Sequence, residues 1–337
     1  MDLENTVLLN EAAETPASGA SAAAFGAGGG AATATVPVRR PRKHKINQEE
    51  VWGTSLASIP LIGFLIFGAI PLVLALAMGF LDFSNAYGWS FEGAVWCGFE
   101  NFIFVLTDKQ FWQAVLNTII FGTSTFISLI FSLAIAYLLT RDIKGRGIWR
   151  MIYFVPYVCS TIALTLMWKE MFNPSWGIIN QMLGNTSLEN GAINWTGEPT
   201  PFYFMVIIMT VWSGMGYGIL LYSAALTNVD QSMVEAATID GAGSFRIFFR
   251  IVLPTISPTT FYLLITGVIG LLQAFATTFT LGSSLTTQSL TIVYYMYNYM
   301  MAYDLGVAGA AAWVLAIFIL IVTVIQFIGS KRWVKYD

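Results

Sequence analysis

Six long apolar stretches constrain this chain more than any other feature. Each reaches or exceeds the ~20 residues that a helix needs to cross a hydrocarbon core about 30 Å thick. Only 10% of the 337 residues are charged and 56% are hydrophobic, so the chain cannot cover a soluble globule with polar side chains. The sequence therefore predicts an all-α membrane protein with six transmembrane helices. The stretches are 56–81, 114–139, 148–168, 202–226, 259–281 and 305–328.

The positive charges give this six-span arrangement a direction. All but two of the 16 lysines and arginines fall in the N-terminal tail, after the second stretch, after the fourth stretch or at the C-terminus. Only Lys109 and Lys169 fall on the other side. Because loops rich in lysine and arginine stay in the cytoplasm, we expect both termini and the connection at about 227–257 to be cytoplasmic.

The N-terminal segment differs in composition from the rest of the chain. Its first 38 residues are rich in Ala, Gly, Thr and Ser and carry few large apolar side chains, so we expect residues 1–50 to form a flexible cytoplasmic tail. Residues 51–337 would then form the membrane domain. The first apolar stretch exceeds the ~7 to 15 residues of a signal-peptide core, so we expect it to remain as a helix. Topology separates Cys97 from Cys159, and no disulfide is expected.

The interiors of the six stretches contain no Asp, Glu, Lys, Arg or His. Proton relays, voltage sensors and ion-coupled pumps usually place ionisable groups there, so these classes are disfavoured. The chain also lacks a nucleotide-binding GxxxxGK[ST] loop, a GxSxG nucleophile elbow, an HExxH pair and a CxxC pair. No catalytic residue or metal site is therefore predicted.

Uncharged polar and aromatic side chains do occur within the stretches. An amide in hydrocarbon needs a partner, so Asn117 and Gln273 either join helices to one another or line a path for a substrate. Trp212, Tyr217 and Tyr222 are further candidates for such a path. Serine and threonine hydroxyls can instead bond the preceding turn of their own helix, which gives them a purely structural interpretation.

The third stretch contains a proline and the fourth contains a cluster of glycines. Gly214, Gly216 and Gly218 alternate in the middle of the fourth stretch. Glycine in a helix interior costs roughly 1 kcal/mol relative to alanine, so such a cluster indicates close packing, with a gate as the alternative. Pro156 interrupts the third stretch.

The cytoplasmic connection 227–257 has an ordered polar pattern. Ser232 and Glu235 have the spacing of a capping box, and Glu235 would also lie in the first turn, where the helix dipole favours a carboxylate. Ala236 and Ala237 follow and would share a small apolar face with the methionine before them. Gly241 is placed to end this helix in a left-handed conformation.

A second short helix should follow within the same connection. Ser244 is a candidate N-cap, and the apolar side chains at 245, 248, 249 and 252 recur at helical spacing. Pro254 and Pro258 are expected to stop this helix before the fifth stretch begins.

The connection as a whole follows one pattern: Glu-Ala-Ala, three residues, Gly, nine residues, then Ile-x-Leu-Pro. This pattern resembles the signature of the permease subunits of binding-protein-dependent ABC importers. The segments 99–102, 141–146, 154–156 and 304–310 are similar to its carbohydrate-uptake branch, and the resemblance covers about residues 50–337. The matching signature positions are Glu235, Ala236, Ala237, Gly241, Ile251, Leu253 and Pro254.

The resemblance implies a fold and a role for the connection. The fold would be that of a type I ABC importer permease, in the plasma membrane of a prokaryote. The first helix of the connection would be a coupling helix that docks in a groove on an ATPase subunit. The residues expected to dock or couple are Ser232, Glu235, Ala236, Ala237, Gly241, Leu253 and Pro254.

The resemblance also implies partners. These would be a second permease subunit, with a heterodimer expected, two ATPase subunits and an extracytoplasmic solute-binding protein, all surrounded by membrane lipid. ATP and Mg would bind to the ATPase subunits, so this chain would hold no cofactor and would not itself be an enzyme. No nucleic acid is expected as a partner.

A sugar or oligosaccharide is the expected cargo, because charge-free spans with amides and aromatic rings suit a neutral hydroxylated solute. Glycerol phosphate is the alternative within the same class, although its phosphate would be expected to need cationic groups that the spans lack. A secondary transporter is an alternative from another class, and it would have no need of the patterned connection. An intramembrane enzyme is disfavoured because no catalytic constellation is present.

Overall fold

The computed structural model describes residues 48–83, 91–140, 143–184, 191–282 and 286–335. Contacts divide the chain into two units, residues 1–57 and 58–337. The described part of the first unit is the beginning of helix α1 (Gln48–Phe64). Most of the predicted N-terminal tail, together with Arg141 and Asp142, lies outside the described residues.

The first apolar stretch forms one long helical run. Helix α1 continues through a π-helical turn (Leu65–Ala69) into α2 (Ile70–Gly79). Pro71 lies at the start of α2 and has no N–H to bond the carbonyl four residues earlier. The wider π turn lies directly before this proline, which is a position where helices commonly absorb such a defect.

Three further stretches form long unbroken helices, as the sequence predicts. They are α4 (Lys109–Leu138), α8 (Pro199–Thr227) and α16 (Leu305–Ser330). Asp108 caps α4 by accepting from the amide of Gln110, and Asp304 caps α16 by accepting from the amide of Val307. Together with residues 52–79, four helices in the described part of the chain are long and apolar enough to cross a membrane.

The third stretch is bent, and the prediction of one continuous helix there is wrong. Helix α5 (Arg146–Val158) meets α6 (Thr161–Met171) at an angle of 97°. Pro156 lies inside α5, and Cys159, three residues later, is extended with φ −70° and ψ 150°. Proline removes one helical hydrogen bond and crowds the turn before it, which favours an early end to the helix.

The fifth stretch is also bent. The helical run 244–255 meets α12 (Ser257–Leu272) at 66°, and α13 (Ala276–Leu281) follows α12 after a short break. If each bent pair counts as one span, the described residues contain up to six spans.

Short elements connect the long helices on the opposite side from the 227–257 connection. Helix α3 (Glu100–Thr107) follows the antiparallel pair β1 (Leu81–Asp82) and β2 (Val95–Trp96). The remaining short helices are α7 (Ile178–Met182), α14 (Thr286–Ser289) and α15 (Ile292–Met301).

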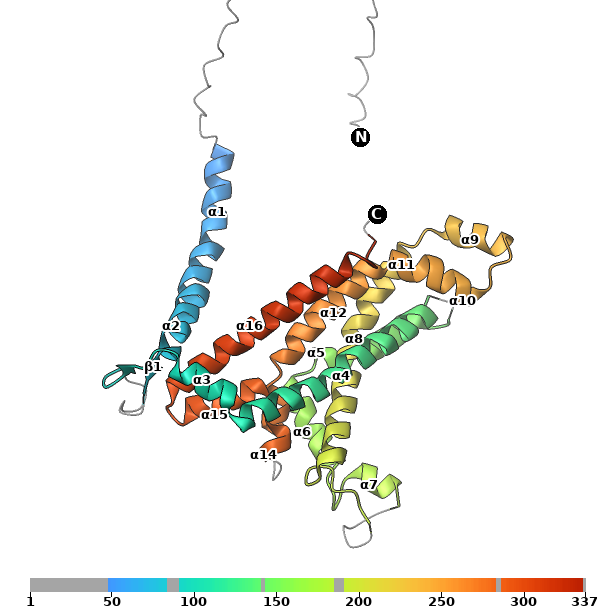
Figure 1. Ribbon diagram of the computed structural model, residues 1–337. Helices are drawn as coiled ribbons and strands as arrows, with labels where there is room; N and C mark the ends of the chain where they lie inside the picture. The colour runs from blue at the N-terminus through green and yellow to red at the C-terminus, as the bar shows by residue number, and fades with distance from the viewer. Residues whose placement is uncertain (1–47, 84–90, 141–142, 185–190, 283–285, 336–337) are drawn as a thin grey trace, which may run out of the picture. The chain divides into compact units, whose positions relative to one another are not determined.

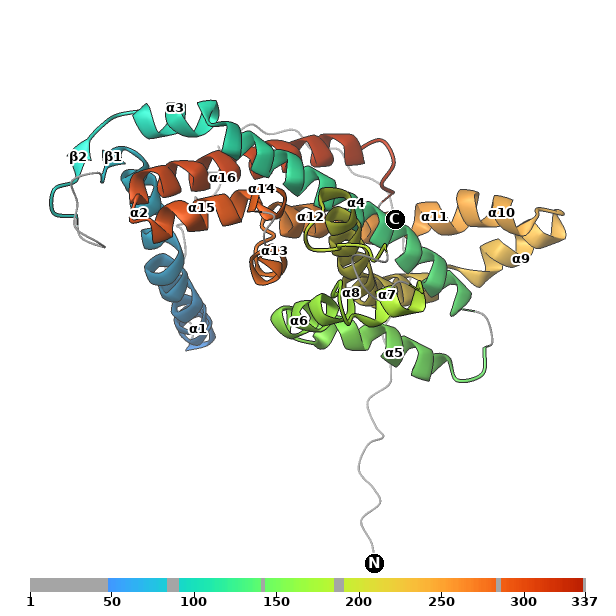
Figure 2. The same ribbon diagram turned by 90° about the horizontal axis from the view of Figure 1, so that it is seen from below.

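Helix packing within residues 58–337 places two groups of helices around α4. Helix α8 packs along α4 and against α5, while α16 packs against α2, α3 and α15. Figure 2 shows α15 and α16 side by side, with α12 next to α4. The α4–α8 contact contains the buried aromatic residues Phe121 and Phe202.

Two glycines explain how α8 approaches its neighbours so closely. A Cβ at Gly216 would collide with the backbone carbonyl oxygen of Tyr153 in α5, and a Cβ at Gly218 would collide with the Ser132 side chain in α4. A Cβ at Gly214, by contrast, would lie 3.5 Å from the Ser128 hydroxyl oxygen, which is an ordinary van der Waals contact. Close packing is therefore the observed role of Gly216 and Gly218.

Candidate functional site

A cavity lined by hydroxyl groups lies between α4, α5, α8 and α12. Its volume is about 380 Å³, within the range of small-molecule sites. Among its lining residues are six that carry serine or threonine hydroxyls, two tyrosines and four glycines, and none that is charged. The hydroxyl-bearing residues of its wall are Ser124, Thr125, Ser128, Ser132, Thr210, Thr266, Tyr157 and Tyr217.

Tyrosine rings form one side of this cavity. The rings of Tyr157 and Tyr217 stack with their centroids 5.0 Å apart and their planes 15° apart. The Tyr217 hydroxyl lies 3.3 Å from that of Tyr262. An aromatic face beside hydroxyl groups can contact both the C–H surface and the O–H groups of a polyhydroxylated solute.

A second, smaller cavity of about 230 Å³ adjoins the first and shares Ser124, Thr125 and Thr210 with it. It extends the hydroxyl-lined space along α4 as far as Phe121. A separate pocket of about 330 Å³ lies at the N-terminal end of α4, and its polar wall includes Lys109 and Gln113. It is called the outer pocket because the positive charges predict that this end of α4 faces outward.

These cavities follow one face of α4. Positions 110, 113, 117, 121, 124, 128 and 132 are three or four residues apart, so they lie above one another on the helix. At 1.5 Å per residue the row is about 33 Å long, which is comparable to the hydrocarbon thickness of a membrane.

Asn117 lies between the outer pocket and the inner cavities, and it is fully buried. Its side-chain nitrogen donates to the carbonyl oxygens of Thr287 (2.7 Å) and Leu290 (2.8 Å). Its oxygen accepts from Gln113 (3.0 Å) and from the hydroxyl of Tyr203 (2.8 Å). All four hydrogen-bonding positions of the amide are therefore occupied, and in this conformation Asn117 joins elements together.

The other predicted path residues fall in different environments. Tyr217 lines the cavity, whereas Tyr222 is only 1% exposed within the core and Trp212 packs against Trp168 at 5.7 Å. Gln273 is exposed and follows the last residue of α12, so it lies outside the continuous helix that was predicted over 259–281. The break after α12 accounts for this, because it ends the helix well before residue 281.

Sequence reasoning missed the hydroxyls that line the cavity. Thr210 and Thr266 do donate to carbonyls of the preceding turn, as expected of such residues. A hydroxyl that donates in this way still presents oxygen lone pairs to the cavity. The sequence feature that could have indicated the cavity is the row of polar positions along α4, which includes Ser124 and Ser128. Hydroxyls that only bond the preceding turn of their own helix have no reason to recur at helical spacing on one face.

The predicted docking helix is present as α9 (Gln231–Ile239). It begins at Asp230, whose side chain accepts from the amide of Ser232 at 2.9 Å, so the predicted capping box with Ser232 as the cap is wrong. An aspartate can cap an amide two residues later, and this one enters the helix in an extended conformation. Hydrogen bonds from the Ser232 hydroxyl and amide lower the pKa of Asp230 below its usual value.

Gly241 ends α9 as predicted. Its φ of +78° is in the left-handed region. The amide of Ala242 donates to the carbonyl of Ala237 at 2.9 Å, and the amide of Gly241 donates to the carbonyl of Thr238 at 3.0 Å. This pair of bonds is the Schellman arrangement, which requires a residue that tolerates positive φ.

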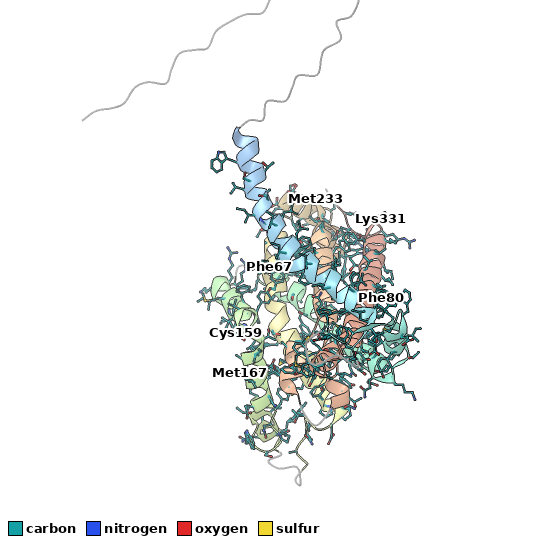
Figure 3. The ribbon with its side chains drawn as sticks, turned by 90° about the vertical axis from the view of Figure 1, so that its left-hand side faces the viewer. Phe67, Phe80, Cys159, Met167, Met233 and Lys331 are labelled. Atoms are coloured by element: carbon teal, nitrogen blue, oxygen red, sulfur yellow. The ribbon has the colours of Figure 1, made fainter. Side chains whose placement is uncertain are left out.

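Most of α9 is exposed. Met233 is 54% exposed and Ile239 is 87% exposed, and Glu235 and Ala236 are exposed between them. Ala237 differs from the prediction because it packs against the core instead of sharing the exposed face. Figure 3 shows Met233 at the same end of the 58–337 unit as Lys331.

The second helix of the connection also differs in detail. Gly243 precedes α10 (Ser244–Ile247), so Ser244 is its first residue and does not cap it. A π-helical turn (Phe248–Val252) continues into α11 (Leu253–Thr255). Pro254 therefore lies inside the helical run and does not stop it, because the π turn before it accommodates the missing N–H. The run ends at Ile256, before Pro258.

The sequence was compared with known protein families. A family model described as "Binding-protein-dependent transport system inner membrane component" matches residues 110–335. The chain is 29% identical over 306 residues to the probable ABC transporter permease protein YesP of Bacillus subtilis (strain 168), an alignment that covers 88% of this chain and 96% of YesP.

A second relative is named for a defined solute. The chain is 32% identical over 247 residues to the sn-glycerol-3-phosphate transport system permease protein UgpA of Salmonella choleraesuis (strain SC-B67). That alignment covers 71% of this chain and 82% of UgpA.

The fold was compared with solved structures. It matches a chain from the crystal structure of a bacterial ABC transporter involved in the import of the acidic polysaccharide alginate, with a TM-score of 0.71. The match covers 85% of this chain and 98% of that chain, at 24% sequence identity. At this identity the likeness establishes a common fold.

Proposed function

The chain belongs to the family of binding-protein-dependent transport system inner membrane components, and on that premise we propose that it is the membrane-spanning subunit of an ATP-driven sugar importer. It receives a sugar or oligosaccharide from an extracytoplasmic solute-binding protein and passes it to the cytoplasm by alternating access. It has six spans, two of them bent, and the type I permease fold. Both termini and the 227–257 connection lie in the cytoplasm.

The hydroxyl-lined cavity is the observation that carries the choice of cargo. Its wall combines the stacked rings of Tyr157 and Tyr217 with serine and threonine hydroxyls, and no charged residue lines it. Hydroxyl groups exchange hydrogen bonds with a neutral saccharide in either direction, since each can donate and accept. A second permease subunit supplies the facing wall, because Tyr157 and Tyr262 are each about half exposed.

The hydrogen-bonded Asn117 supports alternating access. It closes the row of cavities between the outer pocket and the inner cavities by joining α4 to Tyr203 of α8 and to two carbonyls near α14. Passage of a solute from the outer pocket to Ser124 requires these bonds to break. We therefore assign this conformation to the stage of the proposed cycle in which the cavity is closed to the outer side.

The exposure of helix α9 supports a separate ATPase subunit as the source of energy for transport. Met233, Glu235 and Ala236 are exposed on α9 and none of the described residues covers them, and Gly241 fixes its angle to the next helix. An ATPase subunit docks on this helix and holds the ATP and Mg, while this chain holds no cofactor. Ser232, Ala237, Leu253 and Pro254 support the docked helix from within the connection.

Glycerol phosphate is the second candidate cargo, because a relative at 32% identity is named for its transport. Lys109 in the outer pocket could attract its phosphate. The inner cavity offers no cation among its lining residues, however, and a buried phosphate needs one. A neutral sugar therefore fits the inner cavity better.

Competition for uptake separates the two cargoes. The complete importer, in vesicles with its solute-binding protein, should take up a labelled sugar that glycerol phosphate does not displace. Tyr217→Ala should reduce this uptake about tenfold, since stacking contacts are worth roughly 1 kcal/mol or more. The Trp212→Phe control, which keeps an aromatic ring outside the cavity, should retain uptake. Uptake of glycerol phosphate and not of sugars would overturn the proposal.

A further inference from the structure

The C-terminal segment that follows α16 folds back onto the start of α12. The backbone amide of Lys335 donates to the side-chain oxygen of Ser257 at 3.0 Å. These two residues are 78 positions apart in the sequence. Figure 1 shows the end of α16 beside α11 and α12. The last described residue is thereby tied to the boundary between the 227–257 connection and the fifth span.

The same serine hydroxyl also replaces a backbone hydrogen bond that is missing from the helix. Pro258 has no N–H, so it cannot give the carbonyl of Pro254 the bond that a helical residue would donate from that position. The Ser257 hydroxyl donates to the Pro254 carbonyl instead, at 2.6 Å. Ser257 is 4% exposed, so water cannot readily take over either bond. One buried oxygen therefore joins Lys335 to the last residue of the signature.

Aromatic rings form a second contact between the same segments. Trp333 packs edge-on against Phe261 of α12, with ring centroids 5.9 Å apart. Phe261 is 5% exposed and also packs edge-on against Phe327 of α16, at 5.3 Å. The end of α16 and the start of α12 are thus held together by two independent contacts.

These contacts lie where the chain bends. The run 244–255 meets α12 at 66°, and Ile256 at the bend has φ −89° and ψ 5°, outside regular helix. A bend without continuous helical hydrogen bonds can flex, and a flexible bend would absorb movement of α9 before it reached α12.

We propose that Ser257 and residues 331–335, together called the C-terminal strut, hold this bend at a fixed angle and are positioning elements for energy coupling. Movement of α9 then reaches α12 and α16 together. The inference rests on the proposed docking role of α9. The strut touches neither the solute cavity nor the exposed face of α9, so it affects coupling and leaves binding of both partners in place.

Two substitutions at position 335 separate the contribution of the backbone amide from that of the side chain. Lys335→Pro removes the N–H that Ser257 accepts, and Lys335→Ala removes only the side chain. In vesicles that contain the complete importer, Lys335→Pro should raise the ATP hydrolysed per sugar transported about fivefold, the factor that corresponds to one lost hydrogen bond. Lys335→Ala should match the wild type.

A pair of buried serines gives a second, independent test. Ser257→Ala removes both bonds of the strut and should uncouple at least as strongly as Lys335→Pro. Ser330 is the matched control, because it is also buried and its hydroxyl donates to a carbonyl three residues earlier, at 2.8 Å. Ser330→Ala should keep the wild-type ratio of ATP to sugar.

The outcomes separate this inference from the proposed function. A wild-type complex that shows no ATP-driven uptake would contradict the proposed function itself. A coupled wild type with an unchanged ratio in both Lys335→Pro and Ser257→Ala would overturn the strut. Equal losses of ATP hydrolysis and uptake would also overturn it, because they would indicate a structural role alone; co-purification of the ATPase shows that each variant has folded and assembled.

Discussion

At the scale of single residues, polar groups in this chain divide between those that hold the fold and those that face a cavity. Asn117 uses all four of its hydrogen-bonding positions inside the protein. Tyr217 lines the cavity with its ring stacked on Tyr157. Residue type alone did not separate these roles, because both are polar groups in apolar helices.

Asp304 gives a prediction about pH. Burial raises the pKa of this carboxyl, although it accepts a hydrogen bond from the amide of Val307 as the cap of α16. A raised pKa in the folded state means that stability is lost as the pH rises through that value. Asp304→Asn keeps an acceptor for the cap without the charge, so the variant should melt at a higher temperature than the wild type at pH 8.

The same comparison at low pH supplies the control. Below the pKa of Asp304 the wild-type side chain is neutral, so the melting temperatures of the two proteins in detergent should converge as the pH is lowered through that pKa. A constant difference between them at every pH would contradict the assignment of a buried, proton-binding cap.

At the scale of helices, the fit between α5 and α8 depends on Gly216. A methyl group there would collide with the Tyr153 carbonyl oxygen. Gly216→Ala should therefore destabilise the protein by about 1 to 3 kcal/mol, the usual cost of overpacking. Gly214→Ala is the control in the same helix, because its methyl group would meet only the Ser128 hydroxyl. Thermal unfolding in detergent should show the loss in Gly216→Ala alone.

The turn after α9 can be tested with the same kind of pair. Gly241 has φ +78°, whereas Gly243, two residues on, has φ −71°, which any residue tolerates. Gly241→Asp should reorient α9 and uncouple the importer or release the ATPase, while the spans stay inserted. Gly243→Asp introduces the same charge and should keep the ATPase bound. Normal transport by Gly241→Asp would rule out α9 as the docking element.

The sequence predicted the long straight helices and missed the bends. Apolar length identified 114–139, 202–226 and 305–328, which became α4, α8 and α16. It could not separate one helix from two across 148–168, because both halves are apolar and the break depends on the backbone around Cys159. The capping rules correctly predicted that Gly241 ends α9. They failed at the start of the helix, where Ser232 was predicted as the cap, because Asp230 offers an equivalent acceptor two residues earlier.

The candidate site was less predictable than the fold. Tyr217 was among the predicted path residues, but the cavity around it is assembled from four helices that the sequence gives no means to align. The hydroxyls of Thr210 and Thr266 were given a structural role because each satisfies itself locally. Only the packing of α8 and α12 against α4 shows that they face one shared space.

At the scale of the whole molecule, the part of the chain that the structure describes has apolar surfaces that no other described residue covers. The side chain of Phe67, which is labelled in Figure 3, is 83% exposed. Only 11% of the most apolar 18-residue segment of α16 is buried by the rest of the chain. Such surfaces suit lipid or a second permease subunit. The exposed α9 lies on a separate surface, formed by the 227–257 connection, where we propose that the ATPase subunit docks.

The central claim is that ATP hydrolysis on a partner subunit drives solute movement through this chain. The most direct measurement is uptake of a labelled sugar into vesicles that contain the complete importer, with ionophores present to abolish ion gradients. We expect uptake when ATP is available to the ATPase subunits and none when ATP is absent. Uptake that continues without ATP and stops when an ion gradient is removed would contradict it.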